Sequence, residues 1–274
     1  MDSRIPMMTA LNLLQKWFRA YLRLVKDYPE ILNKIDISYE TVQGRFPRRL
    51  RFQFDGRYFD FVSPGTIPVL HIYWEIFREL NYTAPFGTAR TCFGDNRIVI
   101  DLGANIGFFS ILAGAYGSKV FAVEANPCNY YYLLRNIRKN SSGQIIAFNY
   151  SIGSRSGFRD LFVADQWSGS SLIQAQSIGS EFSIVTRGRS FRDLMEEIGN
   201  PKVDLLKMDC EGCESEIIMN ADVDVFRSIR RISLEYHDGT ADYSALRRKL
   251  EDLGFKILDT DDRIGNYGYL RAER

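Results

Sequence analysis

The chain contains 274 residues, of which 45% are hydrophobic, and it carries a net charge of +1. This size and apolar content allow one large domain, or one domain with a smaller extension. The chain has no basic excess, which is the charge signature of nucleic-acid-binding proteins, so we expect no nucleic-acid partner. Its four cysteines and two histidines are sparse. We therefore expect no metal site, and we expect reduced thiols in a cytoplasmic protein.

Residues 1–35 are predicted to be helical, with a break near Pro29. One face of this segment carries the apolar residues Leu11, Leu14, Phe18, Tyr21, Leu22 and Val25. The opposite face is polar and includes the basic residues Lys16, Arg19, Arg23 and Lys26. These charges exclude a transmembrane segment. Three alternatives stay open for this amphipathic helix: packing on its own domain, forming a homodimer, or contacting a membrane surface.

A β-hairpin is predicted next, because residues 50–54 and 58–62 alternate apolar and polar side chains around Asp55-Gly56.

A second helix, rich in aromatic residues, is predicted from Val69 to Leu80. The loop that follows contains proline and glycine and indicates a domain boundary. We therefore expect an N-terminal extension of helices and a hairpin over residues 1–90, followed by the main domain over residues 91–274.

From residue 97 onward, apolar runs of strand length alternate with segments of helix length. The predicted strands are residues 97–101, 119–124, 145–151, 203–209 and 230–236. The predicted helices are residues 107–116, 127–140, 190–199, 214–220 and 241–253. This alternation is typical of an α/β fold with a doubly wound, mostly parallel, Rossmann-like sheet covered by helices on both faces.

Two further features complete the predicted main domain. An additional strand is expected over residues 157–164, and the polar loop 166–171 after it is either a substrate lid or simply an exposed loop. Residues 255–258 and 267–270 are predicted to form a closing antiparallel hairpin, with the turn at Asp261, Asp262 and Gly265. With these two strands, the expected sheet has seven strands.

The segment from Val99 to Ser110 predicts a buried strand, an acidic turn with two glycines and the start of a helix. Glu124 ends the next predicted strand. This pairing is typical of adenosine-type cofactor sites, because glycines let the backbone approach the ligand and the distal acid accepts hydrogen bonds from ribose hydroxyls. A dinucleotide fingerprint would need glycines where this chain has Asn105 and Phe108, which counts against a dehydrogenase.

The spacing instead resembles the D/E-x-G-x-G-x-G loop of class I S-adenosylmethionine-dependent methyltransferases, with Asn105 in place of the middle glycine. That cofactor carries a sulfonium and an ammonium group, which favour a nearby carboxylate such as Asp101. The alternative is an ordinary strand–turn–helix connection, and Glu124 weighs against it. By analogy with the fold, Ser151 and Ile152 border the adenine. The candidate cofactor-binding residues are Asp101, Gly103, Ala104, Asn105, Gly107, Glu124, Ala125, Ser151, Ile152, Asp209 and Glu211.

A second group of ionisable residues lies at or after the ends of the last two parallel strands: Lys207, Asp209, Glu211, Glu235 and His237. The carboxyl ends of parallel strands meet at one edge of a sheet, which is where ligands bind. Buried charge is costly unless it is paired. These side chains are therefore expected either to form a structural ion-pair cluster or to serve a ligand.

Cys210 and Cys213 form a C-x-x-C sequence. A zinc site would need about four ligands, and a redox motif would be expected in a thioredoxin-like unit. Neither context is present in the sequence pattern. We therefore interpret the two cysteines as small residues beside a glycine turn.

Four blocks, taken in order, resemble the FkbM-type methyltransferases: Asp101–Gly107, Val123–Pro127, Val203–Glu214 and Leu234–His237. The chain departs from the family pattern at Ala125-Asn126-Pro127, where Pro-x-Pro is commoner, and at the two cysteines of the third block. The resemblance implies the class I methyltransferase fold, S-adenosylmethionine as cofactor, and methylation of an oxygen on a sugar, lipid or polyketide-like acceptor.

The candidate catalytic residues are His237, Asp209, Glu235 and Lys207. For a hydroxyl acceptor we predict His237 as general base, because neutral imidazole is available at neutral pH. Glu235 or Asp209 would orient it, and Asp209 is the second choice for the base. A small-molecule carboxylate acceptor would need no base. The alternatives are an RNA methyltransferase on the same fold, which should show a basic face, and a non-catalytic cofactor-binding partner protein.

Overall fold

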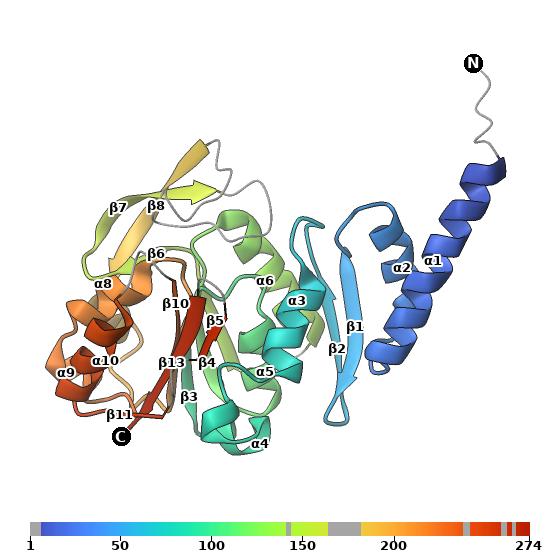
Figure 1. Ribbon diagram of the computed structural model, residues 1–274. Helices are drawn as coiled ribbons and strands as arrows, with labels where there is room; N and C mark the ends of the chain where they lie inside the picture. The colour runs from blue at the N-terminus through green and yellow to red at the C-terminus, as the bar shows by residue number, and fades with distance from the viewer. Residues whose placement is uncertain (1–6, 141–143, 164–181, 238–241, 259–261, 265–266) are drawn as a thin grey trace. The chain divides into compact units, whose positions relative to one another are not determined.

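The computed structural model describes residues 7–140, 144–163, 182–237, 242–258, 262–264 and 267–274 (Figure 1). The chain divides into two compact units, Met1–Tyr73 and Trp74–Arg274. A functional boundary after residue 90 stays a prediction. No helix in the described ranges is both long and apolar enough to cross a membrane.

The first unit combines helices with a β-hairpin. Its helices are α1 (Met7–Asp27), α2 (Lys34–Val42) and α3 (Val69–Tyr73). Its strands are β1 (Arg49–Phe54) and β2 (Arg57–Val62), which pair antiparallel. Asp55 and Gly56 both adopt positive φ, as a two-residue turn requires, so the hairpin prediction is confirmed. The core of the unit contains Phe52, whose ring lies 4.6 Å from that of Tyr73.

The second unit begins with short helical segments before its main sheet. These are the π-helix η1 (Trp74–Arg78), the 3-10 helix η2 (Ala84–Phe86) and α4 (Ala89–Cys92). The predicted helix over residues 69–80 is therefore present as α3 and η1. Helical geometry ends before Leu80, which adopts a positive φ of 55°.

In the described residues the main sheet has eight strands: seven follow the order β11-β13-β10-β9-β3-β4-β5, and the short β12 pairs with β13 off this path. The strands are β3 (Ile98–Leu102), β4 (Lys119–Val123), β5 (Gln144–Phe148), β9 (Leu205–Met208), β10 (Arg231–His237), β11 (Lys256–Ile257), β12 (Asp262–Ile264) and β13 (Tyr267–Glu273). Five of them run parallel, and β13 is antiparallel to β10 and β11. The doubly wound sheet and its closing antiparallel hairpin are confirmed, although part of the predicted turn lies outside the described residues.

Helices cover both faces of this sheet (Figure 1). One face carries α5 (Phe108–Ala115) and α6 (Pro127–Asn140). The other carries α8 (Cys213–Met219), α9 (Val223–Phe226) and α10 (Tyr243–Asp252). The central strands are buried between these layers, as expected of an α/β fold.

The chain order of the sheet reverses between β3 and β9. From β3 the chain continues outward through β4 and β5, whereas β9 and β10 build the sheet in the opposite direction. Ligands of open α/β sheets bind outside the carboxyl ends of the strands at such a switch point. The loops after β3 and β9 therefore define where a site is expected.

A separate three-stranded sheet has the order β6-β8-β7. Its strands are β6 (Ser151–Gly153), β7 (Gly157–Val163) and β8 (Phe182–Ser190), which leads into α7 (Phe191–Glu197). The predicted strand over residues 145–151 is thus divided between two sheets, and β8 was not predicted. Two apolar side chains of this sheet, those of Phe158 and Val185, are exposed to solvent. The loop 166–171 lies outside the described residues.

Candidate functional site

An open cleft lies at the switch point between β3 and β9. The residues that line it are Gly103, Asn105, Val123, Glu124, Ala125, Asn129, Tyr150, Ser151, Ile152, Leu161, Asp209, Cys210 and Glu211. Residues that the sequence assigned to one cofactor site therefore converge on one cleft.

Gly103 is where the two loops at the switch point come closest. It has a φ of +77°, and a Cβ atom there would lie 1.7 Å from the backbone carbonyl oxygen of Asp209. No side chain fits such a contact, so the glycine is required by the close approach of the two loops. Asn105 also adopts the left-handed conformation, at φ +50°. Asparagine tolerates this conformation, which explains how it replaces the middle glycine of the loop pattern.

Glu124 lies beyond the end of β4 and lines the cleft, and its side chain is buried. Its two carboxyl oxygens accept hydrogen bonds from the backbone N–H groups of Asn105 at 2.7 Å and Asn126 at 2.8 Å. Burial raises the pKa of Glu124 to about 7, although these two hydrogen bonds oppose the shift. Each oxygen keeps a second lone pair, which can accept a ribose hydroxyl.

The side chain of Asn105 supplies an unsatisfied acceptor in the same loop. Its Oδ1 atom is buried and has no hydrogen-bond partner among the described residues. Buried polar atoms are seldom left unpaired, so this oxygen fits a donor on a bound ligand. Together with Glu124, it suits the hydroxyl and ammonium donors of S-adenosylmethionine.

The opposite end of the cleft is built by the small sheet and the segment before it. Ser151 and Ile152 of β6 line this end, together with Tyr150 and Leu161. Ile152 and Leu161 are almost fully buried and offer apolar contacts. This mixture of aromatic and aliphatic side chains suits a flat heteroaromatic ring such as adenine.

Asp101 and Lys207 lie beneath the cleft and are not among its lining residues. Asp101 is fully buried, accepts a hydrogen bond from Ser110 Oγ at 2.6 Å, and lies 3.1 Å from Lys207 Nζ. Lys207 Nζ also donates to the Gly103 carbonyl oxygen at 3.0 Å and lies 3.4 Å from Asp209 Oδ2. Burial lowers the pKa of Lys207, but these two carboxylates outweigh burial and raise it overall.

The hydroxyl group of Tyr82 bridges two of the predicted catalytic carboxyl groups. It lies 2.9 Å from Asp209 Oδ2 and 3.1 Å from Glu235 Oε2. A hydroxyl has one proton, so it can satisfy both groups only when one of them is protonated. Burial, followed by the charges of Asp209 and Glu211, raises the pKa of Glu235 well above its usual value. Glu235 is therefore the carboxyl group that retains a proton.

His237 closes this cluster at the end of β10. Its Nε2 atom lies 3.3 Å from Glu211 Oε2 and 3.4 Å from Glu235 Oε1. Burial lowers the pKa of His237, against the opposing charge of Asp209. Burial also raises the pKa of Glu211 well above its usual value. The imidazole is consequently neutral at pH 7 and can accept a proton.

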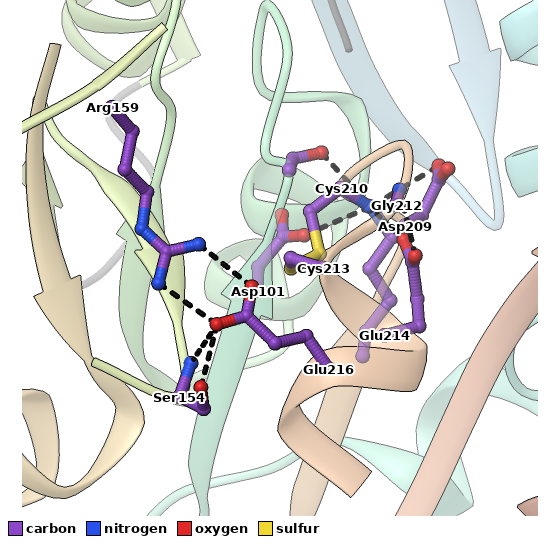
Figure 2. The surroundings of a disulfide bond; sticks show 11 residues. Asp101, Ser154, Arg159, Asp209, Cys210, Gly212, Cys213, Glu214 and Glu216 are labelled. Atoms are coloured by element: carbon purple, nitrogen blue, oxygen red, sulfur yellow. Dashed lines mark hydrogen bonds and ion pairs between the residues drawn. A yellow bond between two sulfur atoms is a disulfide. The ribbon is translucent and has the colours of Figure 1, made fainter. Parts of the chain in front are cut away.

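The loop between β9 and α8 contains a disulfide bond between Cys210 and Cys213 (Figure 2). Gly212, at φ +117°, turns the chain so that the two Cα atoms lie 5.6 Å apart, within the range that a disulfide needs. Glu214 caps the same loop by accepting hydrogen bonds from the backbone N–H groups of Cys210 and Gly212. The prediction of reduced thiols is therefore wrong for these two cysteines, while Cys92 and Cys128 are free. Cysteine usage accordingly no longer supports a cytoplasmic location.

Most of the predicted site residues come together, and some side chains were missed. Of the candidate cofactor contacts, Asp101, Ala104 and Gly107 do not line the cleft. Tyr82 was not predicted, and neither was Glu75. Burial and the charge of Asp209 raise the pKa of Glu75 to about 7. Both lie before the motif-bearing part of the chain. No local pattern marks them, because their role comes from contacts with residues more than a hundred positions away, Tyr82 with Asp209 and Glu235 and Glu75 with Tyr269.

Gly103→Ala is expected to destabilise the protein by about 3 kcal/mol or more, because the new methyl group would overlap the Asp209 carbonyl. Gly254→Ala is the matched control, since Gly254 has a similar φ of +88° but nothing within 4 Å of its Cβ position. Its cost should be only about 1–2 kcal/mol. Denaturant unfolding measures both. Equal effects of the two substitutions would contradict the close approach of the loops.

Binding of S-adenosylmethionine is expected to strengthen as the pH rises through about 7. Burial raises the pKa of Glu124 to about 7. Ribose hydroxyls favour the ionised form of this carboxyl group, so cofactor binding below that pH must release a proton. Calorimetry in buffers of different ionisation enthalpy measures the release. Glu124→Gln should abolish it, whereas Glu251→Gln on the exposed side of α10 should not. Proton release that persists in Glu124→Gln would remove this carboxyl group from the site.

Thiol counting tests the disulfide directly. An alkylating reagent added to the denatured, unreduced protein is expected to label Cys92 and Cys128 alone, and prior reduction should expose Cys210 and Cys213 as well. Mass spectrometry of the peptides distinguishes the four positions. Full labelling without reduction would show that the β9–α8 loop holds free thiols.

The chain is similar to a known methyltransferase family and to individual methyltransferases. The methyltransferase FkbM domain family matches residues 101–257. Methyltransferase 1 of Beauveria bassiana is 24% identical over 212 residues, which are 70% of this chain and 82% of that protein. Hexuronic acid methyltransferase AglP of Haloferax volcanii is 26% identical over 145 residues, or 53% of this chain and 58% of that protein. The crystal structure of M. jannaschii TYW2 in complex with AdoMet has a TM-score of 0.41 and 18% identity, covering 83% of this chain and 87% of that one.

The family match spans the glycine loop, the acid after β4, the β9–α8 loop and the end of β10. These are the segments that build the cleft and the carboxylate cluster. This chain belongs to the FkbM methyltransferase family, and its cofactor is S-adenosylmethionine.

Proposed function

We propose that this chain methylates a hydroxyl oxygen of a small sugar- or lipid-like molecule, with His237 as the general base. The observation that carries the proposal is the position of His237 Nε2 within 3.4 Å of both Glu211 and Glu235. Glu211 itself lines the cofactor cleft. The histidine thus stands next to the place where an acceptor would meet the cofactor.

The cofactor supplies an electrophilic methyl group on a sulfonium. The acceptor oxygen must lose its proton as the new O–CH₃ bond forms and the S–CH₃ bond breaks. A positioned base contributes typically about 10²- to 10⁴-fold to such a step. His237 suits this role because burial lowers its pKa and leaves the imidazole neutral. Asp209, bridged to Glu235 through Tyr82, is the second candidate base.

The charge of the cluster favours a hydroxyl over a carboxylate acceptor. Glu75, Glu211 and Glu235 lie near Asp209, and burial together with neighbouring negative charge raises the pKa of each of these three glutamates. An ionised carboxylate acceptor would meet the same burial and repulsion that disfavour the charged forms of these glutamates. A neutral hydroxyl group avoids that repulsion and can donate a hydrogen bond to a carboxylate.

The sugar class is supported by the name of one relative, the hexuronic acid methyltransferase. Balanced overall charge weighs against RNA as the acceptor. A non-catalytic cofactor-binding protein would have no need for a neutral histidine held between two carboxyl groups beside the cleft. The site therefore supports turnover on a small hydroxyl acceptor best.

His237→Ala is expected to lower kcat by about 10²- to 10⁴-fold while leaving S-adenosylmethionine affinity within a few-fold. A panel of monosaccharides, uronic acids and glycolipids, assayed for S-adenosylhomocysteine release, provides the acceptor. His71→Ala, which removes the other histidine from the exposed side of α3, should match the wild type. Loss of cofactor binding in His237→Ala would assign the residue to structure, and unchanged kcat would point to a carboxylate acceptor.

The pH profile gives an independent check on the same residue. A base works when it is deprotonated, and the pKa of His237 is lowered from 6.5. The acid limb of kcat should therefore fall below pH 6.5. This limb should disappear from the residual activity of His237→Ala. An acid limb that stays in place would transfer the role of base to another group.

A further inference from the structure

Over the part of helix α1 whose side chains are described, three faces can be distinguished, and the face that contains Leu24 packs within its unit. It packs against α2, and the side most deeply covered contains Leu24, which is 7% exposed. Trp17 and Tyr21 stack on each other at the edge of this face, with ring centroids 5.7 Å apart. The packed face therefore takes only part of the helix's apolar surface.

A second apolar face stays exposed. It consists of Leu14, Phe18, Leu22 and Val25, which are 60%, 52%, 48% and 42% exposed. At 3.6 residues per turn these positions form one stripe along the helix. We call these four residues the apolar stripe. Large apolar side chains aligned in this way indicate an interaction surface, whereas isolated ones would not.

Basic residues follow the apolar stripe along the helix. Lys16, Arg19, Arg23 and Lys26 are all exposed, and Asp27 is the single acidic residue of α1. At 100° per residue, these four positions project together on the side of the apolar stripe away from Leu24. The surface is therefore apolar along one line and cationic beside it.

We propose that α1 docks on an anionic lipid membrane, lying in the plane of the interface with the apolar stripe among the acyl chains. Surface-binding helices combine this kind of apolar face with Lys and Arg on the polar face, and they bind anionic lipids most strongly. The helix does not meet the requirements for crossing a membrane. The cationic face supplies attraction to lipid phosphates, and the stripe supplies buried apolar area.

A second copy of the chain fits this surface less well. Four side chains that are about half exposed offer only a few hundred Å², whereas each partner in a stable dimer buries about 800 Å². Apposed stripes would also bring two cationic faces close together, with one acidic residue per helix to compensate. An anionic membrane surface would attract the basic residues of α1, and its acyl chains could cover the narrow apolar stripe.

Flotation with vesicles tests the proposal on the full-length protein. Vesicles of phosphatidylcholine alone are compared with vesicles of phosphatidylcholine and phosphatidylglycerol in equal parts. We expect binding to the anionic vesicles and much weaker binding to the neutral ones. Raising the salt concentration should weaken the binding, because screening shortens the range of the attraction.

Variants on the two faces separate their contributions. Phe18→Glu with Leu22→Glu should reduce binding to anionic vesicles by at least about tenfold, since two apolar side chains no longer bury. Arg19→Gln with Arg23→Gln should reduce it by about fivefold per residue. Tyr58→Glu is the matched control, because Tyr58 on β2 is 53% exposed, close to the 52% of Phe18, but lies outside α1. It should bind as the wild type does.

Circular dichroism and S-adenosylmethionine affinity confirm that each variant is folded, since none of these residues lines the cleft. Absence of wild-type binding to anionic vesicles would overturn the proposal, as would equal binding by Phe18→Glu/Leu22→Glu. A concentration-dependent dimer that Phe18→Glu abolishes, without vesicle binding by the wild type, would assign the stripe to self-association instead.

Discussion

The site depends on one buried cation at the point where the chain order of the sheet reverses. Lys207 Nζ contacts the carboxylates of Asp101 and Asp209 and the carbonyl oxygen of Gly103. It thereby joins β3, β9 and the loops that follow them. Removing one partner of a buried ion pair typically costs about 3–5 kcal/mol, because the remaining charges stay buried and unpaired. The two loops are therefore fixed relative to each other before any ligand binds.

This arrangement divides the charged residues between structure and ligand. Asp101 and Lys207 are almost completely covered and neutralise each other under the loop. Asp209 lines the cleft as well as contacting Lys207, so it links the buried pair to the open site. From Asp209, hydrogen bonds continue through Tyr82 to Glu235. The buried pair thus positions the proposed catalytic end of the network.

The protonation states of Glu211, Glu235 and His237 follow from the same burial. Burial raises the pKa of Glu235 and Glu211 and lowers the pKa of His237, so the neutral form of each group is favoured. Neutral carboxyl groups do not convert the neighbouring imidazole into a cation. A histidine between two ionised glutamates would carry a proton at neutral pH and could not act as a base. Low solvent access is thus what makes the proposed role of His237 chemically possible.

The sequence by itself determined the α/β class, the strands of the main sheet and the residues after β3, β4 and β9, because periodicity and glycine spacing are local signals. It also predicted the family and the cofactor. Only the tertiary structure decided that Asp101 and Lys207 lie beneath the cleft, since spacing places residues at the end of a strand without showing which of them solvent reaches. Tyr82 was invisible because its partners are distant in sequence. The strand β8 was missed because its sequence is mostly polar and Val185, one of its few apolar residues, is exposed. The disulfide of Cys210 and Cys213 depended on the turn at Gly212. On α1, helical periodicity identified the apolar residues, but only packing against α2 showed that Leu14, Phe18, Leu22 and Val25 stay exposed.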